Sequence, residues 1–351
     1  MKIAVLAGGW SPEREVSLTS GTLIANALME NGHRVALVDV YLGVTIPRDG
    51  AEPLFGKTPL PPHTIGEIQP DLAALRASAG NGDALVGRGV IEVCRAADMT
   101  FLAMHGGMGE NGQLQATLDS FGIRYTGSGY IGCLISMDKD LSKRLLRAAG
   151  VLTPDWVYFD AGTPIAECRA VTLEKIGVPA VIKPCSCGSS VGVTIAETAD
   201  ELDAALALAE QYGCPVLAEK KIVGRELTVG VLDGKTLPAV EIVPPKDGFY
   251  DYKNKYSGKT TELCPAPISP EAAKAAEEAA LAGMRALRLS GYARFDFIMD
   301  EGGDLYCLEA NALPGMTPAS LLPLAAREAG IPYQELCEKI LLAGMKNRSP
   351  R

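Results

Sequence analysis

The sequence predicts an α/β layer with a parallel sheet, followed by two α+β segments. The first 40 residues read as strand, loop, helix and strand, with apolar runs at 3–7 and 35–40 and a helix-start signal at 11–13. Such βαβ units build parallel sheets. Towards the other end, two runs of alternating apolar residues flank 300–303, Asp-Glu-Gly-Gly, which is typical of an antiparallel hairpin.

The elements between these ends are expected from apolar periodicity and from Gly and Pro breaks. Residues 43–83 are rich in Gly and Pro and should form an elaborated surface region. Glycines cluster at 127–129, where we expect the first domain to end. The predicted helices are 87–97, 113–120, 130–149, 199–211 and 270–289, and the predicted strands are 99–104, 156–159, 179–183, 216–219, 226–232, 237–243, 293–299 and 304–310.

Composition excludes several classes of protein. The net charge of −9 disfavours nucleic-acid and anionic-membrane partners, which need a basic surface. The N-terminal apolar run is too short for a signal peptide, and no apolar run is long enough to span a membrane. Nine scattered cysteines, an odd number, fit a reducing compartment, so we expect a cytoplasmic protein.

The hairpin carries the sharpest chemical pattern. Arg294 and Asp296 alternate on one strand, and Glu309 and Asn311 alternate on its partner, so all four should share one face, with Phe295, Phe297, Leu308 and Ala310 on the other. Two carboxylates and an amide oxygen suit Mg²⁺ that bridges phosphates. A solvated polar face is the alternative. The Gly-Pro loop that follows at 312–316 favours the metal site, because its N–H groups can meet an oxyanion.

Two other segments suit a nucleotide. Lys183 ends an apolar strand and precedes a Gly/Ser loop at 185–192, whose small residues let N–H groups approach a polyphosphate. This loop lacks the P-loop spacing. Glu219 ends a strand and Glu226 follows, where an adenine and a ribose can bind. Taken singly, a turn and a surface strand end remain open for these segments.

In combination, these residues resemble a known family. Lys139, Lys183, Glu219 and the Arg-x-Asp and Glu-x-Asn strands come in the order seen in ATP-grasp ligases. The chain is most similar to the D-alanine–D-alanine ligase family through Gly8-Gly9, Ser11 to Ser17, Met104-His105-Gly106, Tyr125 to Gly129, Tyr250-Asp251-Tyr252, Lys255-Tyr256 and Pro314 to Thr317. The resemblance spans nearly the whole chain. It implies an ATP-grasp fold in which an N-terminal parallel α/β domain (1–127) and two α+β domains (128–215 and 216–351) enclose ATP.

The resemblance also implies an ATP site and a metal site. The residues that hold the phosphates would be Lys139, Lys183, Ser190 and Lys255. The residues that receive the adenine and ribose would be Glu219, Lys220, Ile222 and Glu226. Two Mg²⁺ ions, which Mn²⁺ is expected to replace, would be held by Asp296, Glu309 and Asn311.

For the substrates, the resemblance implies two D-alanine sites. Glu13 would bind the first ammonium, Ser189 and Tyr256 would form a hydrogen-bonded set with it, and His105 would line this site. Arg294 and the N–H of Gly315 would stabilise the tetrahedral oxyanion. Ser320 and Leu321 would take the second carboxylate. The alternatives are purely structural roles: His105 would stabilise a turn, Tyr256 would pack in a core, and Glu13 would only favour the start of a helix.

The implied reaction joins two D-alanines through an acyl phosphate, for peptidoglycan precursors, in a cytoplasmic homodimer. A polar loop at 245–263 could close over the site to exclude water. D-serine or D-lactate as the second substrate, and a nucleotide sensor without chemistry, are the alternatives. A Rossmann dehydrogenase is rejected because Gly-x-Gly-x-x-Gly is missing after the first strand. Cys185 and Cys187, if exposed, would make the enzyme sensitive to thiol reagents.

Overall fold

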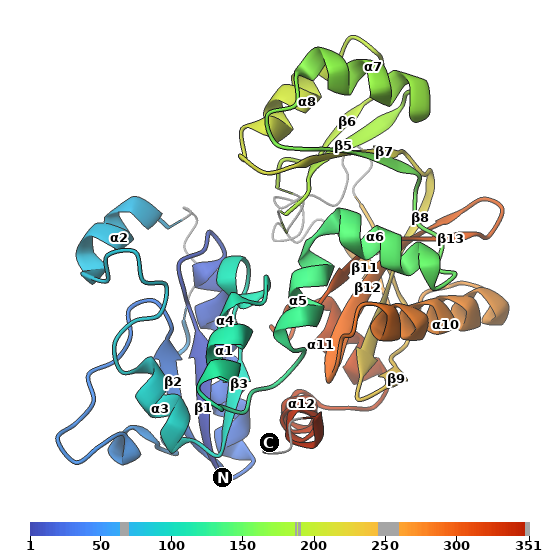
Figure 1. Ribbon diagram of the computed structural model, residues 1–351. Helices are drawn as coiled ribbons and strands as arrows, with labels where there is room; N and C mark the ends of the chain where they lie inside the picture. The colour runs from blue at the N-terminus through green and yellow to red at the C-terminus, as the bar shows by residue number, and fades with distance from the viewer. Residues whose placement is uncertain (64–69, 187, 189–190, 245–259, 348–351) are drawn as a thin grey trace.

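A computed structural model describes residues 1–63, 70–186, 188, 191–244 and 260–347. The chain forms three sheets in sequence order (Figure 1). In the first, the parallel order is β2-β1-β3, with bounds Lys2–Ala7 (β1), Arg34–Asp39 (β2) and Met99–Leu102 (β3). The helical segments of this layer are η1 (Glu52–Leu54), α1 (Arg14–Glu30), α2 (Leu72–Ala79), α3 (Val90–Ala96), η2 (Gly107–Gly109) and α4 (Gln113–Ser120).

The second layer is an antiparallel sheet with two helices before it. Its order is β4-β7-β5-β6, with bounds Trp156–Phe159 (β4), Ala180–Pro184 (β5), Thr194–Ala196 (β6) and Val216–Lys220 (β7). Its helices are α5 (Tyr130–Met137), α6 (Lys139–Ala148), α7 (Ile165–Lys175) and α8 (Leu202–Glu210). β7 lies beyond the predicted domain boundary at 215 and pairs with β4 and β5. The two predicted domain boundaries stay predictions.

The third layer is a six-stranded antiparallel sheet. Its order is β11-β10-β8-β12-β13, and β9 pairs with β8. The bounds are Gly224–Leu232 (β8), Lys235–Thr236 (β9), Val240–Val243 (β10), Thr261–Leu263 (β11), Tyr292–Asp300 (β12) and Leu305–Asn311 (β13). The helices are α10 (Pro270–Ala286), α11 (Leu321–Glu328) and α12 (Tyr333–Asn347). Among the described residues, no helix is long and apolar enough to cross a membrane.

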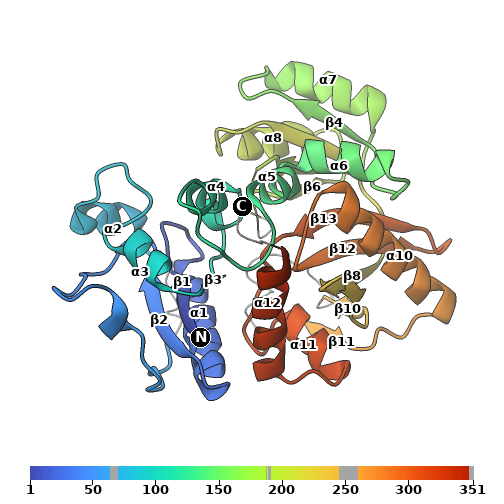
Figure 2. The same ribbon diagram turned by 60° about the horizontal axis from the view of Figure 1, so that its bottom comes forward.

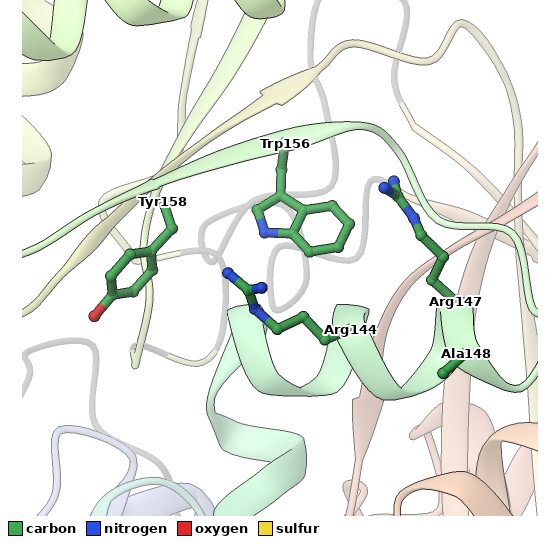
Figure 3. A pocket seen from close by; sticks show the side chains of 5 residues that line it. All are labelled: Arg144, Arg147, Ala148, Trp156 and Tyr158. Atoms are coloured by element: carbon green, nitrogen blue, oxygen red, sulfur yellow. The ribbon is translucent and has the colours of Figure 1, made fainter.

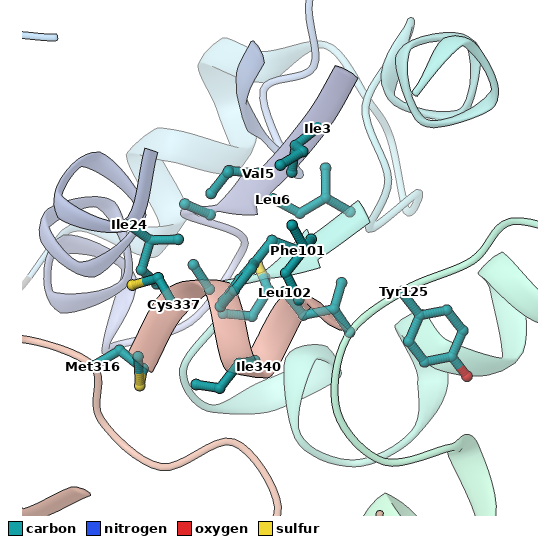
Figure 4. Packing of buried hydrophobic residues seen from close by; sticks show 14 of the residues in the cluster. Ile3, Val5, Leu6, Ile24, Phe101, Leu102, Tyr125, Met316, Cys337 and Ile340 are labelled. Atoms are coloured by element: carbon teal, nitrogen blue, oxygen red, sulfur yellow. The ribbon is translucent and has the colours of Figure 1, made fainter. Parts of the chain in front are cut away.

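The C-terminal helix α12 packs into the core of the first layer, far from it in sequence. Figures 1 and 2 show α12 beside α1 and β3, and Figure 4 shows Cys337 and Ile340 facing Ile24, Phe101 and Leu102. Cys337 and Ile340 have no exposed surface. The first layer therefore depends on the end of the chain for part of its apolar burial.

The predicted helix at 130–149 is wrong in one respect, because it is two helices. Asp138 has extended backbone torsions, and its Oδ1 accepts a hydrogen bond from the N–H of Leu141 at 3.0 Å. An aspartate in this position caps a new helix. The break places Lys139 in the first turn of α6.

Truncation of Ile340 tests the contribution of α12 to the first layer. We expect Ile340→Ala to lower the free energy of unfolding by about 2–4 kcal/mol, because it leaves a cavity in a closed core. On the same helix, Leu342 is 43% exposed, so Leu342→Ala should change stability by less than about 0.5 kcal/mol. Thermal and urea unfolding measure both. Equal losses for the two variants would contradict the packing of α12.

Candidate active site

The first side of the site lies where the parallel strands β1 and β3 end. In a parallel sheet the carboxyl ends of strands meet at one edge, so the loops after Ala7 and Leu102 come together there. Gly106 has φ of +68°, and a Cβ built on it would lie 2.7 Å from Oε2 of Glu13. Glycine is therefore required for this approach. The structure thus places Glu13 against the loop that carries His105.

His105 is a buried ring whose orientation is fixed by a hydrogen bond. It is 5% exposed, and its Nε2 lies 3.0 Å from Oγ of Ser20. Burial lowers the pKa of His105, while the charge of Glu13 opposes this shift. On the same helix as Ser20, Oγ of Ser17 accepts a hydrogen bond from the N–H of Gly8 at 2.9 Å and donates one to the carbonyl of Ala103 at 2.7 Å. These bonds join the two loops to α1.

The second side is the β12–β13 hairpin, and its predicted polar face is present. Arg294 donates to both oxygens of Asp296, from Nε at 2.9 Å and Nη2 at 2.8 Å. Asn311 Nδ2 also donates to Asp296, at 2.9 Å, and Thr228 Oγ1 donates at 2.6 Å. Asp296 and Glu309 are direct partners across the ladder. Thr228 was not predicted, because its partner Asp296 is on another strand of the sheet.

One detail of the apolar face was predicted wrongly. Leu308 was expected opposite the aromatic residues, but the ladder pairs Asp296 with Glu309 and then Phe297 with Cys307. Leu308 is therefore the extra residue of a β-bulge. Cys307, with no exposed surface, takes its place on the apolar face, together with the buried Phe295 and Phe297.

The hairpin fits a hard cation by its donor set. Asp296 and Glu309 supply carboxylate oxygens, and Asn311 uses its nitrogen to bond Asp296, which leaves its amide oxygen chemically suited to a metal. Among the described residues there is no cluster of three His, Cys, Asp or Glu side chains, so the amide has to complete the set. These residues fit Mg²⁺, while Arg294 and Asn311 donate hydrogen bonds to the carboxylate of Asp296.

The third side comes from the start of α6 and the end of β5. Lys139 is 7% exposed, its Nζ lies 4.0 Å from Oε2 of Glu309, and its N–H bonds the carbonyl of Cys185 at 3.3 Å. A lysine in the first turn of a helix suits an anion. Cys185 itself is 1% exposed, and burial raises the pKa of its thiol to about 12, so it should resist thiol reagents. Cys187 lies outside the described residues.

A cluster of two lysines and one glutamate joins α6 to the central sheet. Lys183 Nζ donates to Oε2 of Glu219 at 2.8 Å. Lys143, which the sequence did not single out, lies with Nζ 3.5 Å from Oε1 of Glu219. Burial would raise the pKa of Glu219, but the two lysines outweigh it and lower that pKa. Lys220 is exposed and Ile222 is half-buried just beyond β7.

Of the remaining predicted residues, the structure describes some and leaves others outside the described ranges. Glu226 lies on β8 two residues before Thr228, so it shares the polar face with Asp296. Gly315 lies so close to Ser320 that a Cβ on it would be 2.8 Å from Oγ of Ser320. Ser320 precedes α11 and the buried Leu321 begins it, a position that suits a carboxylate. The predicted residues Ser189, Ser190, Lys255 and Tyr256 lie outside the described residues.

Glu110 is a site residue that the sequence analysis missed. Its side chain is 20% exposed, and Oε1 lies 4.0 Å from Nδ1 of His105. Burial, and next the charge of Glu13, raise the pKa of Glu110 to about 8. Its loop position after His105-Gly106 was the available signal. A narrow cavity of about 30 Å³ brings Glu110 together with other residues of all three layers, among them Lys139, Gly188, Glu309 and Asn311.

A larger hollow lies elsewhere and does not contain the predicted residues. Figure 3 shows it between α6 and β4, with Arg144, Arg147, Trp156 and Tyr158 around about 510 Å³. Its arginines are already paired, Arg144 with Asp140 at 2.7 Å and Arg147 with Asp155 at 2.8 Å. The chemistry therefore favours the smaller cavity between the layers as the active site.

Comparison with known proteins agrees with this geometry. A family model described as D-ala D-ala ligase N-terminus matches residues 2–128, and one described as D-ala D-ala ligase C-terminus matches residues 145–342. A D-alanine–D-alanine ligase of Pediococcus pentosaceus is 40% identical over 354 residues, covering 99% of this chain and 98% of its own. One from Gloeobacter violaceus is also 40% identical, with 97% and 98% covered.

Solved structures give the same result. A crystal structure of D-alanine–D-alanine ligase from Bacillus anthracis complexed with ATP has a TM-score of 0.76 and 31% identity, with 99% of this chain and 98% of that chain covered. A D-alanine–D-alanine ligase from Coxiella burnetii, at 24% identity, shares the fold with a TM-score of 0.76, over 99% and 94% of the chains. The predicted fold class and family are confirmed. The chain belongs to the D-alanine–D-alanine ligase family.

Proposed function

We propose that this protein joins two D-alanine molecules to D-alanyl-D-alanine with ATP, through a D-alanyl phosphate. The observation that carries the proposal is the cavity between the three layers, where Glu110, Lys139, Glu309 and Asn311 meet. This cavity connects the edge of the first sheet, where carboxylates suit an ammonium group, with the β12–β13 hairpin, whose residues suit Mg²⁺. The family relatives are named for this reaction. The product serves peptidoglycan precursor synthesis.

ATP would lie between the central sheet and the C-terminal sheet. Glu219 and its neighbours Lys220 and Ile222 receive the adenine, and Glu226 the ribose. Lys139 and Lys183 hold the phosphates, together with Ser190 and Lys255. Mg²⁺ bound by Asp296, Glu309 and Asn311 would neutralise phosphate charge as the γ-phosphoryl group transfers.

The chemistry needs two displacements and no side-chain nucleophile. Glu13 holds the ammonium of the first D-alanine, which directs its carboxylate to the γ-phosphorus; ADP leaves and an acyl phosphate forms. The amine of the second D-alanine, with its carboxylate at Ser320 and Leu321, then attacks the acyl carbon. The acyl C–O bond then breaks, and the departing phosphate takes up the proton that the amine nitrogen loses. Arg294 and the N–H of Gly315 stabilise the tetrahedral oxyanion between these steps.

The support for Arg294 is geometric. Its guanidinium is fixed by both oxygens of Asp296 and is only 11% exposed. Gly315 precedes Met316, whose carbonyl accepts from the hydroxyl of Tyr333 at 2.6 Å and whose side chain is 1% exposed. Both oxyanion groups are therefore held before the substrate arrives, which is the condition for electrostatic stabilisation of a transition state. Ser189 and Tyr256 complete the set around Glu13 in this proposal.

The wider setting is proposed on the same basis. We place the protein in the cytoplasm as a homodimer that pairs through its N-terminal region, with domains 1–127, 128–215 and 216–351. All eight cysteines in the described residues are free, which fits a reducing compartment. The two substrates of the reaction are small molecules, ATP and D-alanine.

Product analysis tests the reaction directly. With ATP and Mg²⁺ we expect phosphate release with D-alanine but not with L-alanine, and a D-alanyl-D-alanine mass. When D-serine or D-lactate is added in competition, the D-alanine dipeptide should remain the main product. Nucleotide binding without phosphate release for any D-amino acid would sink the ligase proposal and leave a nucleotide sensor. If the main product instead joins D-alanine to D-serine or D-lactate, the assignment of D-alanine as the second substrate is wrong.

Replacement of Asp296 tests the hairpin. We expect Asp296→Asn to lower kcat on the order of 10³-fold, because it removes a charge from the metal set and from Arg294. Glu301→Gln, at the exposed turn that follows the same strand, is the matched control and should stay within about twofold. Steady-state phosphate release measures both. Full activity of the Asp296 variant would contradict the assignment.

The raised pKa of Glu110 predicts a pH-dependent stability in the ligand-free protein. Folding favours the protonated carboxyl, so this stabilisation is complete below about pH 4.5 and is lost as the pH rises through about 8. Glu110→Gln should then be more stable than the parent by up to about 3 kcal/mol at pH 7, and equally stable near pH 4. Unfolding in EDTA across this range measures the difference. A constant difference would show that Glu110 does not titrate this way.

A further inference from the structure

Lys143 is a completely buried lysine to which the proposed chemistry gives no role. It lies on α6 with 0% of its surface exposed. Taking an ammonium group out of water costs several kcal/mol unless it is paired and hydrogen-bonded. A methionine or leucine would fill the same volume without this cost. The presence of a charge here therefore calls for a physical account.

Hydrogen bonds account for two of the three N–H donors of Lys143. Nζ donates to Oγ1 of Thr153 at 2.6 Å and to the carbonyl of Pro154 at 3.2 Å. Its third neighbour is Oε1 of Glu219 at 3.5 Å, and the ring of Trp156 lies 5.2 Å away, measured to its centroid. Trp156 and Glu219 are direct partners across the β4–β7 ladder. Lys143 thus reaches the face of the central sheet that carries Glu219.

Glu219 divides its two oxygens between two lysines. Oε2 accepts from Lys183 at 2.8 Å, whereas Oε1 is buried and accepts no hydrogen bond from any residue that the structure describes. Lys143 lies too far from Oε1 for a strong hydrogen bond but close enough for charge compensation. Oε1 is therefore neutralised and still able to accept a hydrogen bond from a ligand.

This division matters when ATP binds. Lys183 is the lysine at the end of β5, the group assigned to the phosphates. To reach a phosphate it has to weaken its bond with Glu219, which takes one counter-ion away from a buried carboxylate. Lys143 has no such second task, because Thr153 and Pro154 fix it in place. It would stay beside Glu219 if Lys183 turned towards a phosphate.

We propose that Lys143 is a positioning residue, a standing counter-ion that keeps Glu219 charged and fixed while Lys183 turns to the ATP phosphates. This inference rests on the proposed ATP site. The charge balance supports it: burial lowers the pKa of Lys143 to about 8, and the charge of Glu219 opposes this shift. Without Lys143, Glu219 would hold Lys183 more tightly and ATP would have to compete for it.

The experiment is a double-mutant cycle on nucleotide affinity. Lys143→Met should raise the Kd for a non-hydrolysable ATP analogue with Mg²⁺ by about 10- to 100-fold. In a Glu219→Gln background the same change should raise the Kd less than about threefold, because a neutral amide needs no counter-ion. Calorimetric titration measures all four proteins. The KM for ATP should rise in parallel, while the KM for D-alanine stays within about twofold.

Two controls separate positioning from structure. Thr153→Val removes a hydrogen bond to Lys143 but keeps the charge, so it should lower stability with less than a threefold change in ATP affinity. Lys143→Gln, which can still donate to Thr153 and Pro154, should weaken ATP as the Met variant does and replaces it if that variant does not fold. Equal losses of affinity in both Glu219 backgrounds, or a loss of stability with unchanged affinity, would overturn the proposal.

The outcome is separable from that of the proposed function. Nucleotide affinity is measured without turnover, so it reports on Lys143 even if the protein forms no dipeptide. A parent protein that binds the ATP analogue but does not ligate D-alanine would sink the ligase proposal alone. A parent that ligates D-alanine, with a cycle that shows no coupling between Lys143 and Glu219, would sink the counter-ion proposal alone.

Discussion

The burial of Phe295 and Phe297 against α10 is the constraint on which the active site depends. Gly283 of α10 lies so close to Phe295 that a Cβ there would come within 2.5 Å of the ring. Side chains alternate along a strand, so fixing the aromatic residues on one face forces Arg294 and Asp296 onto the other. The position of the charged groups is thus set by apolar packing, which is strong and does not depend on ligands.

The same principle joins the layers around the cavity. Met316 is buried in the core that α12 shares with β1 and β3, so the loop that carries Gly315 is anchored to the N-terminal layer (Figure 4). Lys139 reaches the hairpin from α6, and Glu110 reaches the cavity from the loop after β3. Groups from three sheets converge without forming one continuous sheet. Movement between the layers would therefore alter the site itself, which fits a reaction whose acyl phosphate has to be kept from water.

The fold and the hairpin could be predicted from the sequence, because both follow from patterns of apolar and polar residues that repeat every few positions. The βαβ start and the alternation around Arg294 and Asp296 can be read from neighbouring residues. What it could not predict depends on contacts distant in sequence. The packing of α12 on the first layer is one such case. Helix α7 (Ile165–Lys175) was missed because its apolar face is weak, with Cys168 and Thr172 as its buried residues. The bulge at Leu308 has no local signal.

Site residues follow the same division. Glu13, Asp296 and Glu309 were found through motifs, whereas Glu110 and Lys143 were not, because a charged residue on a loop or helix is ordinarily solvated and its burial is a tertiary property. Both missed residues lie near groups that motifs identify. Glu110 is a carboxyl whose pKa the charge of Glu13 helps to raise, whereas Lys143 offsets the charge of Glu219. A buried site for ATP and two D-alanine zwitterions needs charge compensation when it is empty as well as when it is filled. Motifs identify the groups that are expected to touch the ligands, and the structure adds the buried neighbours that surround those groups.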